Sequence, residues 1–225
     1  MAISDTLLLT QERIRVATQA AGREPDTVRL LCVSKTFPAA AVREALAAGA
    51  RAFGENYVQE GLAKIEALAD LRALLEWHLV GPLQSNKTRP VAEAFDWVHA
   101  VDRLKIAERL SEQRPAGMPP LNICLQVNIS GEASKSGVAV ADVAALAAQM
   151  ASLPRLRLRG LMALPEPGPG ATDQHREMGR LFVGLQAQGL AVDTLSLGMS
   201  ADLEAAISAG STMVRVGSAI FGARG

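Results

Sequence analysis

The stretch RLLCVSKTFP, residues 29–38, decides the fold. It begins with an apolar, strand-forming run, and the Ala-rich stretch 39–48 that follows has helical periodicity. The turn between them, around Lys35, lacks the Gly-rich phosphate-binding sequence that follows the first strand of a doubly wound sheet. A strand followed by a helix is the unit of parallel sheets, so the number of such units decides between an open sheet and a barrel.

The same alternation continues along the chain. Beside the strand at 29–34, further strands are predicted at 51–54, 77–80, 97–100, 122–128, 158–163, 194–197 and 213–216. Helical stretches between and after them cover 39–48, 58–69, 86–95, 103–112, 140–152, 174–188 and 202–209. Eight such strands predict a closed (β/α)8 TIM barrel, formed by residues 1–225 as a single domain.

A helix precedes the first strand. Residues 4–20 place Leu7, Leu8, Ile14 and Ala17 near helical spacing. Ser4 is the expected N-cap and Gly22 the expected stop. The Gly- and Pro-rich stretch 164–170 is expected to be a surface loop rather than a domain linker.

Composition narrows the function. Lys plus Arg and Asp plus Glu both number 23, so no net charge favours nucleic acid or an anionic membrane surface. The N-terminus does not resemble a signal peptide, and no run of about 18 apolar residues is present, which predicts a cytoplasmic protein. Cys32 and Cys124 lie in apolar runs without CxxC spacing and are expected to be structural rather than metal ligands.

Lys35 is the first candidate site residue. In a (β/α)8 barrel the functional groups lie at the carboxyl ends of the strands, and Lys35 follows the first strand directly. A long cationic side chain there would reach into the barrel mouth. A solvated lysine on the rim is the alternative, since most lysines are exposed.

Two turns rich in Gly and Ser indicate a phosphate site. Barrels often bind phosphate with the loops after strands seven and eight, and here these loops contain Ser200 and the pair Gly217 and Ser218. The hydroxyls and backbone amides can donate to an anion, while Gly217 permits close backbone approach. Alternatively, Ser200 only caps its helix and Gly217 only turns the chain.

Arg215 adds a cation to this region. If Met213, Arg215 and Gly217 point toward the barrel axis, a guanidinium enters the interior, where it needs a partner such as a ring nitrogen or a carboxylate. A lysine, a phosphate cradle and an arginine between them match the aldehyde, phosphate and pyridine nitrogen of pyridoxal 5'-phosphate (PLP). The sequence therefore favours PLP, held as a Schiff base on Lys35.

Five ordered motifs resemble a known family. They are residues 33–36 (VSKT), 53–60 (FGENYVQE), 77–87 (WHLVGPLQSNK), 196–202 (SLGMSAD) and 215–222 (RVGSAIFG). Together they resemble the PLP homeostasis proteins, the YggS-like group related to the N-terminal barrel of alanine racemase. The resemblance spans about residues 28–222.

The resemblance implies roles for individual residues. Lys35 would carry the imine; Ser200, Gly217 and Ser218 would hold the phosphate; and Arg215 would face the pyridine nitrogen. It also implies that Asn56, His78 and Met162 line the pocket. From the residues alone, the favoured interpretations of these three are a turn residue, a barrel-core histidine and core filling.

Two parts of the resemblance leave roles open. The segment 130–137, with Asn128 before it and Lys135 within it, resembles a family segment of undefined role. Many relatives have a second lysine two residues after the imine lysine, where this chain has Phe37. A PLP-exchange role for that second lysine therefore does not transfer to this chain.

The sequence favours a PLP carrier over an enzyme. Racemases of this barrel type take a second base from a separate C-terminal domain, whereas this chain ends at Gly225, nine residues after Val216. We therefore expect a monomeric protein of PLP storage and delivery, without catalytic residues or a metal, whose partners are PLP and PLP-dependent apo-enzymes. The alternatives are a small amino-acid racemase, or a sugar-phosphate barrel with an aldolase-type Lys35.

Overall fold

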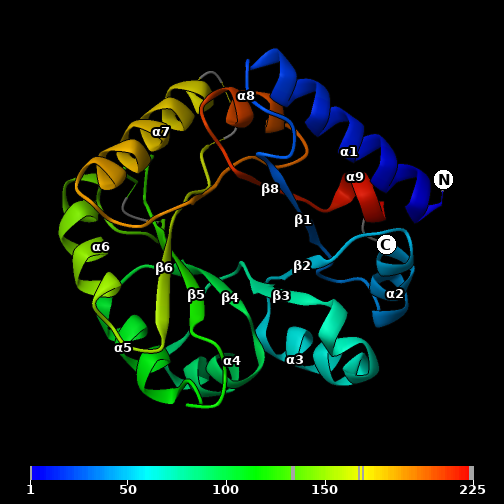
Figure 1. Cartoon of the computed structure of the whole chain (residues 1–225), viewed down its shortest axis with the longest axis horizontal. Coiled ribbons are helices and arrows are strands. Elements are labelled where there is room, and N and C mark those ends of the chain that lie inside the picture. Colours follow the sequence, from blue (N-terminus) through cyan, green and yellow to red (C-terminus); the bar gives the residue numbers. More distant parts are fainter. Residues whose placement is uncertain (1, 133–134, 167, 169, 223–225) are drawn as a thin grey trace.

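Each of the eight predicted runs forms a parallel strand in a computed structural model, which describes residues 2–132, 135–166, 168 and 170–222. The strands are β1 (Arg29–Val33), β2 (Ala52–Glu55), β3 (Glu76–Leu79), β4 (Trp97–Val101), β5 (Leu121–Gln126), β6 (Leu156–Met162), β7 (Thr194–Ser196) and β8 (Met213–Val216). They pair in sequence order and close between β8 and β1 (Figure 1). The predicted (β/α)8 barrel is confirmed.

Helices surround the barrel on its outer side (Figure 1). They are α1 (Ile3–Ala20), α2 (Ala39–Ala47), α3 (Val58–Ala67), α4 (Thr88–Ala94), α5 (Leu104–Gln113), α6 (Val143–Ala151), α7 (Ala171–Ala187), α8 (Leu203–Ser208) and α9 (Ser218–Phe221). Three 3-10 helices, η1 (Ala69–Leu74), η2 (Ser85–Lys87) and η3 (Val140–Asp142), extend the connections. Sequence periodicity did not find η1 or α9; α9, at four residues, is too short to show a period.

The leading helix differs from its prediction in two details. The N-cap position is Ala2, without a side-chain hydrogen bond, so Ser4 lies inside the helix and is not the cap. Leu8 lies on the solvent side and is 67% exposed, because one residue turns the helix by about 100° from the buried Leu7. The predicted stop is confirmed: Gly22 has φ 67° and its amide donates to the Gln19 carbonyl.

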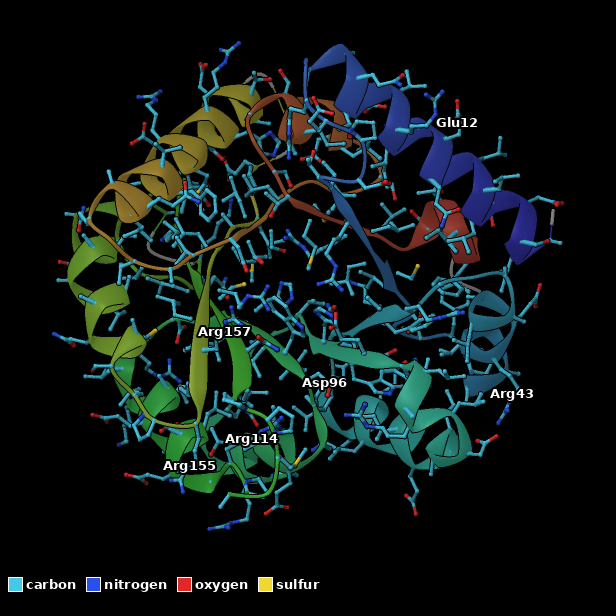
Figure 2. The ribbon with its side chains drawn as sticks, viewed as in Figure 1. Glu12, Arg43, Asp96, Arg114, Arg155 and Arg157 are labelled. Carbon is cyan, nitrogen blue, oxygen red and sulfur yellow. The ribbon has the colours of Figure 1, made fainter. Side chains whose placement is uncertain are left out.

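The core has two parts. The larger lies between the sheet and the helices and includes Val214 and Val216 of β8. The interior holds two smaller clusters, one of Trp97, Ala100, Cys124 and Met162 and one of Leu31, Ala52 and Met213. Figure 2 shows the interior filled with side chains, as expected for a packed barrel rather than a pore.

Both cysteines are buried, one on each side of the sheet. Cys32 packs toward the helices and Cys124 toward the interior. Burial raises the pKa of both thiols to about 12, so neither is a thiolate near neutral pH. Within the described residues, no cluster with the composition of a metal site is found. The helices in this part of the chain are all too short or too polar to cross a bilayer.

Candidate functional site

Lys35 lies just beyond β1, at the carboxyl end of the barrel. Leu31 of β1 packs in the interior, and alternation along the strand directs Val33 to the same side. Lys35 follows two residues later, in the turn that leaves the strand. The Lys35 side chain is half-buried. This placement agrees with a lysine at the barrel mouth rather than one on a fully solvated rim.

The backbone after Lys35 is strained. The Phe37 amide donates to the Ser34 carbonyl at 3.0 Å, which closes a tight turn around Lys35. Thr36 has φ 70° within it, a conformation that costs a β-branched residue about 1–3 kcal/mol. The Thr36 amide donates to the Glu60 carboxylate, which compensates for part of that cost. The turn therefore fixes the direction of the chain next to Lys35.

A buried ion pair supports the same turn from outside the barrel. Lys64 of α3 donates to the Ser34 carbonyl at 2.7 Å and to the carboxylates of Glu55 and Glu60, both at 2.8 Å. The Ser34 hydroxyl donates to the same Glu55 oxygen at 2.5 Å. Burial raises the pKa of Glu55, against the opposing effect of Lys64. The motif 53–60 thus holds the end of β1 in place, a role that sequence reasoning missed.

The two Gly/Ser turns lie side by side after β7 and β8. The Arg215 amide donates to the Gly198 carbonyl at 2.9 Å, which joins the two strand ends. A Cβ on Gly217 would lie 2.9 Å from the Val33 carbonyl oxygen, so glycine is required for β8 to approach β1 this closely. Ser200 is partly exposed and Ser218 exposed. The structure therefore brings Ser200, Gly217 and Ser218 to the barrel end where Lys35 lies.

The loop after β7 is shaped by Asp202, which is the N-cap of α8. Its carboxylate accepts from the Met199 amide at 2.7 Å and lies 3.3 Å from Nε2 of the buried His175 on α7. Burial alone would raise the pKa of Asp202, but the contacts with His175 and the Met199 amide lower it. Asp202, and not Ser200, therefore stands at the N-cap position of α8, without a side-chain hydrogen bond to that helix.

Arg215 points into the barrel, as predicted. The residue is 5% exposed, and its guanidinium donates to the Ser196 carbonyl at 2.6 Å, the Ser196 hydroxyl at 2.7 Å and the Ala163 carbonyl at 2.9 Å. All three acceptors are uncharged, and burial lowers the pKa of Arg215 to about 10. In strand register Arg215 is paired with Leu31. It therefore lies below Lys35 and beside the two Gly/Ser turns.

A chain of hydrogen bonds continues from Arg215 through the interior. The Ser196 hydroxyl lies 3.0 Å from His99 Nδ1, and His99 Nε2 lies 2.8 Å from His78 Nδ1. His78 Nε2 lies 2.7 Å from Glu76, whose carboxylate also accepts from Arg29 at 2.7 Å. His78 stacks on Trp97 with ring centroids 5.1 Å apart. Sequence reasoning named His78 but missed His99 and Ser196.

The three remaining predicted residues occupy different places. Asn56 lines a cavity of about 280 Å³ at the mouth, together with Gly81, Asn128, Lys135 and residues near them. His78 and Met162 are buried in the interior and do not line that cavity. Their proposed contact with a ligand stays a prediction. The observed packing fits the core roles that their residue types favour.

Lys135 lies at the edge of this cavity. Its ammonium is 2.8 Å from Glu166 and 3.2 Å from Glu132, and the two carboxylates raise its pKa. Asn128 orders the same segment by donating to the Glu132 carbonyl at 2.7 Å. Residues 133 and 134 of the segment, and 167 and 169 of the predicted Pro/Gly loop, lie outside the described residues.

Comparison with known proteins gives a consistent result. The family model for the alanine racemase N-terminal domain matches residues 10–225. A PLP homeostasis protein of Pseudomonas aeruginosa is 64% identical over 99% of this chain and 96% of its own length. The protein of that name from Escherichia coli K12 is 56% identical over 99% and 97%.

Solved structures show the same barrel. PipY of Synechococcus elongatus, solved with PLP bound, is 38% identical, with a TM-score of 0.83 over 98% of this chain and 100% of its own. Alanine racemase of Corynebacterium glutamicum shares the fold, with a TM-score of 0.65 at 19% identity, and this chain covers 59% of it. The chain belongs to the alanine racemase N-terminal domain family and, within it, to the group of PLP homeostasis proteins.

Proposed function

We propose that this protein binds PLP at the barrel mouth and stores and delivers it in the cytoplasm, as a single-domain monomer that supplies PLP-dependent apo-enzymes. Lys35 forms the Schiff base, the turns with Ser200, Gly217 and Ser218 hold the phosphate, and Arg215 faces the pyridine nitrogen. The names of the relatives from P. aeruginosa and E. coli and the PLP bound to PipY support this proposal.

One observation carries it: three strand ends that are consecutive around the barrel supply the three kinds of group that PLP needs. Lys35 follows β1, Arg215 lies on β8, and the Gly/Ser turns follow β7 and β8. Gly217 lies against Val33, two residues before Lys35. A ligand with an aldehyde, a ring nitrogen and a phosphate can therefore engage all three from one side of the mouth.

The residues fit the cofactor at the ring nitrogen as well. Arg215 uses three of its N–H donors on neutral oxygens, and within the described residues its remaining two have no hydrogen-bond partner. A neutral pyridine nitrogen is an acceptor, and a donor that stays protonated suits it. Bound PLP would supply an electron-accepting ring, and an arginine at its nitrogen makes that ring a weaker acceptor than a carboxylate would.

Two further observations favour a carrier over a racemase. The relatives that are 64% and 56% identical are named for PLP homeostasis and not for a reaction. A racemase also needs a base on each face of its substrate, and Lys35 supplies one. Within the described residues, the lining of the mouth cavity adds Lys135 as the one further ionisable side chain, and that ammonium is paired with Glu132 and Glu166.

The test of this function is an absorption spectrum of the PLP-loaded protein, followed by identification of the peptide to which PLP is attached. Protein loaded with PLP should absorb near the edge of the visible range, and borohydride should fix the cofactor on the peptide that contains Lys35. Transfer to a PLP-dependent apo-enzyme, measured as recovered activity of that enzyme, tests delivery. A label on another peptide would refute the site, and transfer no faster than from free PLP would refute the delivery role.

A further inference from the structure

Helix α1 packs against both elements that follow the Gly/Ser turns. Figure 1 shows α1 beside α8 and α9, which begin after the turns at 198–202 and at Gly217. The contacting face of α1 buries Leu7, Ile14 and Ala17. Polar side chains of the same helix reach further, to the backbone of the two segments.

Arg13 connects α1 to the first turn. Its Nη1 donates to the Ser200 carbonyl at 2.7 Å. The Glu204 carboxylate, in the first turn of α8, accepts from Nη2 at 2.6 Å and also from Nε. One guanidinium therefore fixes both the backbone of Ser200 and the start of the next helix. The two side chains are 39% and 52% exposed, so this ion pair adds little to the overall stability.

Thr6 connects α1 to the second segment. Its hydroxyl lies 2.7 Å from the Ile220 carbonyl of α9 and 3.0 Å from the Ile3 carbonyl of its own helix. The Ile220 amide in turn donates to the Gly217 carbonyl at 2.9 Å. Two side chains seven residues apart on α1 thus contact the Ser200 turn directly and the helix that follows Gly217.

We infer that α1 braces the predicted phosphate cradle, and that Arg13 is a positioning residue that keeps the Ser200 turn in its binding shape. The inference rests on the proposed PLP site. A turn that is already ordered loses less conformational freedom when it binds an anion, so the brace raises affinity for the phosphate without touching it. Loosening α1 would accordingly weaken the hold on the phosphate.

The experiment uses matched variants of α1. Arg13→Gln and Thr6→Val each remove one contact between elements. Arg15→Gln and Thr10→Val are their controls, because Arg15 pairs with Glu12 within the helix and Thr10 donates to the Thr6 carbonyl. Glu12 lies on the outer surface of α1 (Figure 2). Dissociation constants for PLP and for pyridoxal, which lacks the phosphate, are measured by absorbance.

Arg13→Gln and Thr6→Val should each weaken PLP binding about threefold to tenfold and leave pyridoxal binding unchanged. Arg15→Gln and Thr10→Val should change neither constant. Arg13→Lys should restore part of the PLP affinity, because an ammonium can still donate to the Ser200 carbonyl. The thermal midpoint of each variant, measured in parallel, shows whether it is folded, and Thr6→Val keeps the test open if Arg13→Gln is not.

The outcomes separate the brace from the site. If wild type prefers PLP and both brace variants match their controls, α1 does not act on the cradle and the inference is wrong. An equal loss for both vitamers would reduce Arg13 to a general stabilising residue and would also overturn it. If wild type binds PLP and pyridoxal equally, the phosphate cradle itself is absent, and the proposed site fails together with the inference.

Discussion

The Ser196 hydroxyl donates its hydrogen bond to His99 Nδ1, in a direction that is set from the far end of the hydrogen-bonded chain. The Glu76 carboxylate can only accept, so a neutral His78 donates to it from Nε2 and accepts at Nδ1 from His99 Nε2. A neutral His99 then accepts at Nδ1 from Ser196, whose oxygen accepts from the Arg215 guanidinium. Every bond from Arg215 to the Glu76 carboxylate thus points the same way. The chain needs both histidines neutral.

The protonation states give a first prediction, a loss of stability below about pH 6.5. Burial lowers the pKa of His78, and burial together with the positive charge of Arg215 lowers the pKa of His99 well below its usual value. Below pH 6.5 the unfolded chain binds protons that the folded chain does not. The free energy of unfolding should fall by up to about 1.4 kcal/mol per pH unit for each histidine. Above pH 6.5 the two histidines are neutral in both the folded and the unfolded chain, so they cause no further change in the free energy of unfolding with pH.

Urea unfolding of wild type and His99→Gln between pH 7.5 and 5.5 measures this slope. The variant should show about half of the histidine contribution, since one of the two groups is removed. The ¹⁵N shifts of both rings should report the Nε2–H tautomer at pH 7.5. An identical slope in the variant, or an Nδ1–H tautomer at His99, would refute the assigned chain.

The sequence predicted the strands of the barrel better than the polar contacts inside it. Strands were found because each is a short apolar run, and the direction of Arg215 followed from simple alternation. His99 and Ser196 escaped notice because their meeting depends on how β4 and β7 face each other across the barrel, and the β4–β5 ladder shifts register between Val98 and Val101. No spacing along the chain contains that information.

The start of α1 and the long-range polar contacts were not predicted from the sequence for a related reason. Ser4 has the right residue type for a cap, but the helix begins at Ile3, which depends on the contact of that end with α2: the Ile3 amide donates to Glu44. Lys64 has the pattern of a solvated helix lysine, and it is buried because the motif 53–60 brings Glu55 beneath α3. A single sequence carries no signal for such pairs.

Lys35→Ala gives the second prediction. The variant should lose the imine absorbance. Its free energy of unfolding should change by no more than about 0.5 kcal/mol, because Lys35 lies outside the hydrophobic core. Lys135→Ala is the matched control and should keep the band. A full band in Lys35→Ala that disappears in Lys135→Ala would move the attachment to the cavity edge.

The third prediction concerns the approach of β8 to β1. In Gly217→Ala, the new methyl group would lie 2.9 Å from the Val33 carbonyl oxygen, so the turn must move. Losing one charge-assisted hydrogen bond of about 1.5 to 3 kcal/mol would weaken PLP binding at least about tenfold. Gly184→Ala on α7, where a methyl group meets no atom within 4 Å, is the control. Equal PLP affinity in both variants would show that Gly217 has no part in the cradle.

The fourth prediction tests the buried pair behind Lys35. Lys64→Met leaves the Glu55 carboxylate buried without its cation and should cost about 3 kcal/mol of stability at pH 8. Since the pKa of Glu55 is already raised and rises further without Lys64, the carboxyl takes up a proton and the cost shrinks toward pH 5. Glu55→Gln combined with Lys64→Met should recover part of the loss at pH 8.

Arg43→Met serves as the comparison for this pair, because the exposed ion pair of Arg43 with Asp70 should contribute less than about 1 kcal/mol. Chemical unfolding at the two pH values measures wild type and the three variants. A Lys64→Met cost that is independent of pH would show that Glu55 does not titrate. The buried pair would then not be the cause of the destabilisation.

The last prediction concerns Arg215 and separates a carrier from a slow enzyme. If its free N–H donors face the pyridine nitrogen, Arg215→Gln removes the cation that keeps that nitrogen unprotonated, while the amide can keep one of the bonds to Ser196 or Ala163. The ring then accepts electrons more readily, so the α-hydrogen of added alanine should exchange with solvent faster than in wild type. Exchange should stay slow in both, because Lys35 is the one base that the described residues supply at the proposed Schiff-base position. Deuterium incorporation into alanine, followed by NMR on PLP-saturated protein, measures this exchange.

Arg159→Gln is the control for this prediction, since Arg159 lies over Trp97 in the same interior and bonds to Asp193 and Asn122, away from the Arg215 contacts. Rapid exchange of the α-hydrogen already in wild type would contradict the carrier function and would favour a racemase. Exchange that is equal in wild type, Arg215→Gln and Arg159→Gln would mean that Arg215 only stabilises the barrel, with its donors turned away from the cofactor.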